Sequence, residues 1–114
     1  MDIYIGLLNY NMRIKSLIYF FIISAVFPSV RPENNSTVNY THVLFAWEEI
    51  SDVSEYNLLV TSNNSTILDI TTSNLYYIEY DNIDWDTSYS WQVCDSNNNL
   101  ICSEFYSFTT GSEI

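Results

Sequence analysis

Apolar and polar side chains alternate with a period of two residues along most of the chain beyond residue 42. Tyr56-x-Leu58-x-Val60 and Tyr89-x-Trp91-x-Val93 are the clearest examples, and this period is typical of β-strands rather than helices. Clusters of Asn, Asp, Ser and Thr separate the apolar runs and favour turns. The pattern predicts seven strands, near residues 36–40, 43–47, 56–60, 67–70, 75–80, 89–93 and 101–109. Short strands at this spacing indicate an all-β fold, a seven-stranded antiparallel sandwich of two sheets.

The apolar positions of these strands predict the interior. Aromatic residues make up 17% of the sequence, and each ring that becomes buried removes roughly 150–250 Å² from water. The expected core residues are Phe45, Trp47, Tyr56, Leu58, Val60, Ile83, Tyr89, Trp91 and Val93. Because the stretch after residue 30 has a single glycine, Gly111, we expect Asn and Asp to adopt the left-handed conformations that its turns need.

Several motifs occur in an order that resembles the fibronectin type III domain family. They are Pro32, Phe45-x-Trp47, Tyr56-x-Leu58-x-Val60, Ile83-Asp84-Trp85-Asp86-Thr87-Ser88-Tyr89-Ser90-Trp91-Gln92-Val93, Ser103, and Tyr106-Ser107-Phe108-Thr109-Thr110. The resemblance implies an immunoglobulin-like sandwich. It also implies a tyrosine corner, in which Tyr89 follows the buried aliphatic Ile83 by six positions. Trp85 and Asp86 stand where many members of the family have Pro-Gly.

The N-terminal segment predicts export. Arg13 and Lys15 precede an apolar run at residues 17–27 that only Ser24 interrupts. This order is typical of a secretory signal peptide, and the run is shorter than the roughly 20 residues that span a bilayer. The alternative is a short, uncleaved anchor. We interpret Met12 as the true start. We therefore divide the chain into an N-terminal extension with signal peptide (1–30), a fibronectin type III-like domain (31–110) and a tail or linker (111–114), and we expect a secreted or cell-surface location.

Charge limits the partners of this domain. From Glu33 to the C-terminus the sequence has thirteen acidic residues and no Lys or Arg. Phosphate groups are contacted chiefly by Lys and Arg, so this composition excludes nucleic acids and anionic membrane surfaces as partners. A protein, a neutral or cationic ligand, or a metal ion remains. Further domains in a longer parent chain are another class of partner.

Cys94 and Cys102 flank an Asn-rich segment between the last two predicted strands. With Asn98 at the tip, Ser96 pairs with Leu100 and Asp95 with Ile101, and the two cysteines then face each other. Opposed residues lie about 4.5–5.5 Å apart at Cα, within disulfide range. The alternative is a pair of buried thiols. The same register sets Trp91 opposite Phe105 on the inner face and predicts a bulge before Phe108.

Asparagine glycosylation sequons provide candidate modification sites in an exported protein. They begin at Asn34, Asn35, Asn39, Asn63 and Asn64. Adjacent pairs compete, so these five positions make three separate sites.

Catalytic patterns are scarce. His42 is the only base near neutral pH and is interpreted as a strand-edge residue. No nucleophile elbow or phosphate loop is present, so we expect no enzyme activity and no cofactor. Four clustered carboxylates offer the oxygens that Ca²⁺ prefers, although their spacing is not that of a known calcium loop. These weak metal candidates are Glu79, Asp81, Asp84 and Asp86.

The leading hypothesis is a secreted or surface-displayed module for protein interaction or spacing. The family resemblance places residues 48–55 and 95–99 at one end of the sandwich, and these loops are the first candidates for a binding surface. Two alternatives stay open. One is an N-terminal accessory domain of a truncated, larger exported enzyme, such as a sulfotransferase or glycoside hydrolase. The other is a calcium-binding structural module.

Overall fold

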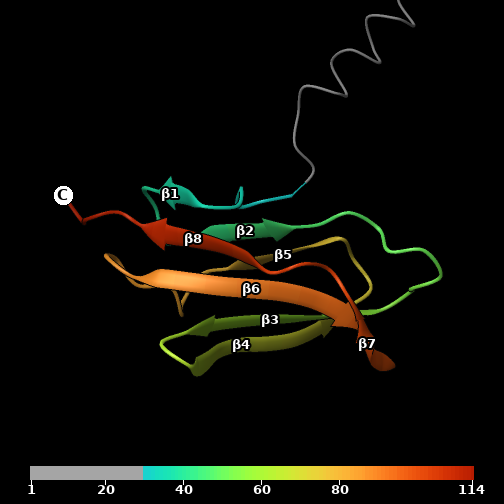
Figure 1. Ribbon diagram of the computed structural model, residues 1–114. Coiled ribbons are helices and arrows are strands. Elements are labelled where there is room, and N and C mark those ends of the chain that lie inside the picture. Colours follow the sequence, from blue (N-terminus) through green and yellow to red (C-terminus); the bar gives the residue numbers. More distant parts are fainter. Residues whose placement is uncertain (1–29) are drawn as a thin grey trace, which may run out of the picture.

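The computed structural model describes residues 30–114, which form eight strands in two sheets (Figure 1). The strands are β1 (Ser36–Val38), β2 (Val43–Ala46), β3 (Tyr56–Ser62), β4 (Ser65–Thr72), β5 (Tyr76–Glu79), β6 (Ser88–Asp95), β7 (Asn98–Cys102) and β8 (Tyr106–Thr110). No helix occurs within this range. The predicted all-β, two-sheet fold is confirmed. The strand count is eight rather than seven, because residues 103–105 interrupt the last predicted run.

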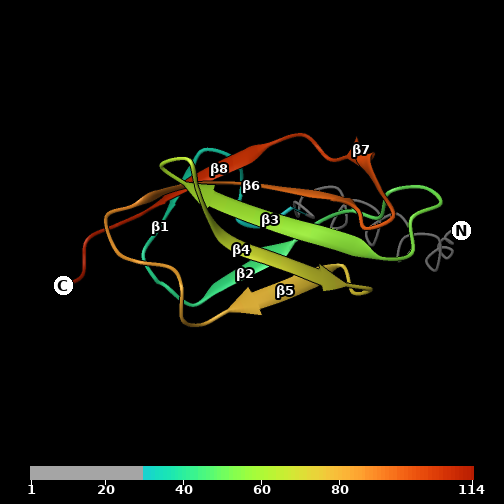
Figure 2. The same cartoon turned by 90° about the horizontal axis from the view of Figure 1, so that it is seen from below.

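The larger sheet has the strand order β1-β8-β6-β3-β4, with β7 also pairing with β6, and the smaller sheet consists of β2 and β5. Figure 2 shows β2 and β5 side by side beneath β3 and β4. All pairs are antiparallel except β1 with β8, which is parallel. The expectation of a purely antiparallel sandwich is wrong at this position. Arg31 forms an isolated antiparallel β-bridge with Ala46, the last residue of β2. The chain then crosses to the larger sheet, where β1 runs in the same direction as β8.

The core lies between the two sheets. All nine residues that the sequence pattern assigns to the interior are buried in the structure, with exposed fractions of 5% or less. Phe45 on β2 contacts Trp91 on β6 and Phe108 on β8, with ring centroids 5.4 and 5.9 Å apart. A ring that buries roughly 150–250 Å² contributes about 4–6 kcal/mol before the entropic cost of ordering it. These aromatic contacts between sheets therefore hold the small domain together.

Asn and Asp occupy the left-handed backbone positions, as predicted from the shortage of glycine. The residues with positive φ are Asn35, Asp52, Asn63, Asn64 and Asp86. Asn63 and Asn64, with φ of 52° and 65°, form the two-residue connection between β3 and β4. Positive φ at both central residues is what a tight type I′ hairpin turn requires.

A tyrosine corner carries the chain from β5 to β6, and thus from one sheet to the other. Ile83 is buried, and the backbone N–H of Asp84 donates a 2.8 Å hydrogen bond to the Tyr89 hydroxyl. The family resemblance implied this arrangement. Asp86 has φ of 54°, so it supplies the left-handed conformation that glycine supplies in the more frequent Pro-Gly pair.

Candidate functional site: the loop end of the sandwich

The 48–55 loop and the β6–β7 hairpin lie at the same end of the sandwich (Figure 1). The backbone N–H of Ser96 donates a 3.0 Å hydrogen bond to the carbonyl oxygen of Glu55, and the Ser96 hydroxyl donates a 2.8 Å bond to Glu55 Oε1. The family resemblance predicts both loops at one end. We call the 48–55 loop, the β6–β7 hairpin and residues 103–105 together the loop end.

Tyr56 ties the 48–55 loop to the core. Its buried hydroxyl accepts a 3.1 Å hydrogen bond from the Ile50 N–H and donates a 3.3 Å bond to the Val53 carbonyl. The Val53 N–H in turn donates to the Ile50 carbonyl, and Asp52 takes a left-handed conformation within this turn. Val53 itself is buried. The loop therefore has a fixed shape before any partner arrives.

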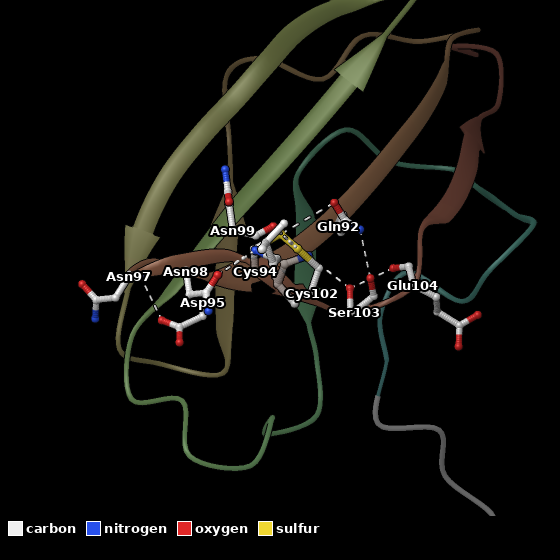
Figure 3. Close-up of a disulfide and its surroundings, with 11 residues drawn as sticks. Gln92, Cys94, Asp95, Asn97, Asn98, Asn99, Cys102, Ser103 and Glu104 are labelled. Carbon is white, nitrogen blue, oxygen red and sulfur yellow. Dashed lines mark hydrogen bonds between the residues drawn. A yellow bond between two sulfur atoms is a disulfide. The ribbon is translucent and has the colours of Figure 1, made fainter.

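A disulfide between Cys94 and Cys102 closes the β6–β7 hairpin (Figure 3). The two residues are directly paired across the strands, as predicted. The predicted tip at Asn98 is wrong, because Asp95 pairs with Asn98 and the turn lies at residues 96–97. Asp95 Oδ1 accepts a 2.9 Å hydrogen bond from the Asn97 N–H and fixes that turn. Residues 99–101 are then inserted between two adjacent paired positions and bulge outward.

Ser103 holds the segment that follows the disulfide. Its N–H donates to the Val93 carbonyl at 2.8 Å, and its hydroxyl accepts a 3.2 Å bond from the Val93 N–H. The side chain of Gln92 donates to the Ser103 carbonyl at 3.0 Å (Figure 3). Beyond this point the register shifts by one residue, and Trp91 pairs with Tyr106. The predicted bulge before Phe108 thus exists, but the predicted pairing of Trp91 with Phe105 is wrong.

Three large apolar side chains are exposed at this end as a result. Leu100 is 88% exposed, Phe105 66% and Ile101 41%. The sequence pattern did not single them out, because it assigned Ile101 and Phe105 to a regular strand. The sequence does carry a signal for this exposure. In a regular strand Tyr106 and Phe108 would point away from the core, and they face the core only if one residue before them is left out of the strand pairing.

The loop end also carries six acidic side chains. Glu48, Glu49, Asp52 and Glu55 belong to the first loop, Asp95 lies in the hairpin, and Glu104 follows it. Burial raises the pKa of Tyr106 above its usual 10.0, and the negative charges of Glu104 and Glu48 raise it further. Tyr106 packs on Trp91 with ring centroids 4.8 Å apart. Carboxylates from two separate segments therefore act on the same ring, and the loop end carries both acidic and exposed apolar side chains.

The four calcium candidates lie at the other end of the sandwich and are engaged in turns. Glu79 is buried, and its Oε2 accepts hydrogen bonds from the Asp81 N–H and from both the backbone and the side chain of Asn82, at 2.8–3.0 Å. Asp84 takes part in the tyrosine corner, and Asp86 Oδ1 accepts a 2.8 Å bond from Ser112. Between residues 30 and 114 no group of three or more His, Cys, Asp or Glu side chains is placed to hold a metal ion.

His42 and the sequons have clear structural positions. The His42 ring makes an edge contact with Tyr80 at 5.2 Å between centroids. Side-chain oxygens of Asn34 and Asn35 accept hydrogen bonds from Ser107. The other sequon asparagines, Asn39, Asn63 and Asn64, are exposed. The asparagines at 63 and 64 form the β3–β4 turn, at the end of β3 opposite the loop end.

The predicted signal peptide and the start at Met12 fall on residues 1–29, outside the described part of the chain. Within the described part, no helix has both the length and the apolar character needed to cross a membrane.

No protein family model and no curated protein matches the sequence. A solved structure described as "Structure of FN3tt mut" is similar to the chain, with 19% sequence identity and a TM-score of 0.46. The match covers 68% of this chain and 93% of that one. The fibronectin type III-like fold of the chain follows from its own strand pairing and its tyrosine corner.

Proposed function

We propose that this chain is an exported, non-catalytic interaction module whose loop end binds a cationic segment of another protein. The observation that carries the proposal is the exposure of Leu100 and Ile101 on the disulfide-closed hairpin and of Phe105 just after it, in a loop end that also carries acidic side chains. A few desolvated apolar anchors supply most of the affinity in typical protein interfaces. The acidic surround favours Lys and Arg in the partner and speeds its approach.

Rigidity of the loop end supports the same function. Ordering loops and side chains on binding costs about 0.5–1.5 kcal/mol for each immobilised side chain. Here the hydrogen bonds of Tyr56 fix one loop, the disulfide closes the other, and Ser96 joins the two through Glu55. A surface arranged in this way loses little conformational entropy when a partner binds.

Export is supported by the disulfide and by features outside the loop end. A disulfide persists in oxidising compartments and is rare in cytosolic proteins. The exposed Asn63 and Asn64 sequons and the signal-like N-terminal segment are consistent with passage through a secretory pathway.

The test is a selection of random peptides displayed on phage against the purified protein. We expect the selected peptides to combine Lys or Arg with a large apolar residue and to bind more weakly as salt rises. Leu100→Ser and Phe105→Ser should each weaken that binding by about tenfold or more, the cost of removing an interface anchor. Leu44→Thr, which removes an exposed apolar side chain elsewhere, should leave it unchanged.

Peptides that show no preference for Lys or Arg would contradict the cationic partner. Peptides that bind the Leu100→Ser and Phe105→Ser proteins as tightly as the unaltered protein would contradict the loop end as the site.

A further inference from the structure

The small sheet carries apolar side chains on its outer side as well as on its inner side, where Glu79 is the buried exception. Three cross-strand pairs make up this outer surface: His42 with Tyr80, Leu44 with Ile78, and Ala46 with Tyr76. Tyr80 is 58% exposed, Tyr76 51%, Leu44 42% and Ile78 39%. We call these six residues the outer apolar face.

The larger sheet shows the usual alternation instead. Its outward positions on β3, β6 and β8 are mostly polar, among them Thr61, Ser90 and Ser107, which are neighbours in the strand register, and Leu59 is an apolar exception. An antiparallel sheet with one face in water normally alternates apolar and polar residues. Strands β2 and β5 depart from this rule, and strands that are apolar on both faces are typical of a sheet that is covered on both sides.

The size of the outer apolar face is that of an interaction surface. At roughly 200 Å² for a large side chain, the exposed fractions of its two tyrosines and two aliphatic residues leave about 400 Å² of apolar surface. The largest apolar patch on a typical monomer is about 300–600 Å² and often has a function.

Charge around this face indicates which molecule covers it. The six residues of the face include no Asp, Glu, Lys or Arg. A shallow groove beside it is lined by Arg31, Glu33, Tyr40 and Leu44, and Arg31 Nη1 lies 3.4 Å from Glu33 Oε2. Arg31 is the only Lys or Arg between residues 30 and 114. The outer apolar face is therefore bordered by one positive and one negative side chain, Arg31 and Glu33. The other Asp, Glu, Lys and Arg residues of the domain are all acidic.

We propose that the outer apolar face binds a second copy of this chain in a two-fold symmetric dimer. A two-fold interface joins one patch to itself and must be self-complementary. An uncharged apolar centre meets that requirement, and at its border Arg31 of one copy can face Glu33 of the other. The acidic loop end does not meet it, because two copies would bring like charges together. This dimer goes beyond the proposed function and uses a different surface.

The dimer is expected to be weak and to strengthen with salt. A standard interface buries about 800 Å² on each partner. The area of the outer apolar face together with its border is smaller than this. We expect a dissociation constant of about 10–100 μM. The thirteen acidic residues from Glu33 onward in one copy repel those in the other copy, and salt screens that repulsion. The dimer fraction should therefore rise between about 0.05 M and about 0.5 M NaCl, where the Debye length falls from roughly 14 to 4 Å.

The test is sedimentation equilibrium of protein purified after expression of the full 114-residue sequence, at increasing concentration. We expect reversible dimers for the unaltered protein and monomers for the Leu44→Thr/Ile78→Thr double variant. Threonine suits β-strands and removes only exposed apolar surface, so the fold should persist. Leu100→Thr, which removes an apolar side chain at the loop end, should leave the dimer intact.

A second measurement tests directly whether the outer apolar faces of two copies lie close together. Tyr76→Cys on the outer apolar face should form a cross-linked dimer on mild oxidation, whereas Thr71→Cys on the polar side of the larger sheet should not. Protein that stays monomeric at every concentration would overturn the proposal. This is also the result expected if a different protein, rather than a second copy, covers the outer apolar face. Equal cross-linking of the two cysteine variants would also overturn it.

Discussion

Replacing both cysteines, Cys94→Ala with Cys102→Ala, should lower the free energy of unfolding by about 2.5 kcal/mol. The disulfide joins residues separated by eight positions. Closing a loop of that length removes about 9 cal/mol/K of entropy from the unfolded chain, which is about 2.5 kcal/mol near room temperature. The strand that it anchors has little other support, because β7 pairs only with β6 in the sheet and its residues are mostly exposed.

This loss is large relative to the whole stability of the domain. Small domains unfold with about 5–15 kcal/mol, and for a domain of this size each kcal/mol corresponds to a melting-temperature shift of about 4–8 °C. We therefore expect the double variant to melt about 10–20 °C below the unaltered protein.

Urea unfolding followed by tryptophan fluorescence provides the assay, because Trp47 and Trp91 are buried in the native core. The unaltered protein with a reductant should resemble the double variant, and the reductant should have no effect on the variant itself. An unfolding free energy that stays within about 0.5 kcal/mol of the unaltered value would refute the reasoning, since it would mean that the cross-link does not restrict the unfolded chain.

Three further predictions concern single residues. Tyr89→Phe leaves the Asp84 N–H without its 2.8 Å hydrogen bond and should cost about 1–3 kcal/mol in urea unfolding. Asn64→Ala removes the short polar side chain that lets asparagine tolerate a left-handed turn and should cost about 1 kcal/mol, whereas Asn64→Gly should be close to neutral. The raised pKa of Tyr106 means that its hydroxyl ionises in the unfolded chain near pH 10.0 and in the folded domain only at higher pH, so stability should fall as pH rises above 10.0. Glu104→Gln should lower the pKa of Tyr106 in the folded domain. This pKa is measured from tyrosinate absorbance during a pH titration, with the Tyr106→Phe protein as the reference that lacks this hydroxyl.

Much of the fold follows from local rules that the sequence expresses directly. Alternation identifies the inner face of each long strand, because a one-residue shift would expose every apolar side chain at once. The five positive-φ positions are all Asn or Asp for a similarly direct reason. With glycine almost absent, these are the residue types that tolerate the left-handed region best.

The register of the β6–β7 hairpin was not predictable in the same way. Asn97, Asn98 and Asn99 are chemically equivalent candidates for the turn, so composition does not locate the tip. Placing Cys94 opposite Cys102 does not determine how the seven residues between them divide into a turn and a bulge. The structure uses a tight turn at residues 96–97 and places the surplus residues in a bulge. That choice exposes Leu100, and the candidate binding surface depends on it.

The outer apolar face was missed for a different reason. Residues 75–80 are apolar except for Glu79. Such a run is compatible with a strand buried on both sides and does not reveal which side lacks a cover. Only the pairing of Leu44 with Ile78 shows that one side of both strands points away from the core. The crossing from Arg31 to β1 likewise depends on long-range pairing with β2 and β8.

The two proposed surfaces should act independently of each other. Leu100 and Phe105 lie at one end of the sandwich, whereas Leu44 and Ile78 occupy the outer side of the small sheet, and the two groups share no paired strand. Substitutions at separate sites without shared partners are normally additive to within about 0.5 kcal/mol. The monomeric Leu44→Thr/Ile78→Thr protein should therefore bind the selected cationic peptides with an affinity within about threefold of the unaltered protein, as measured by calorimetric titration. A larger loss would show that binding at the loop end requires the dimer, and the two surfaces would then form a single composite site.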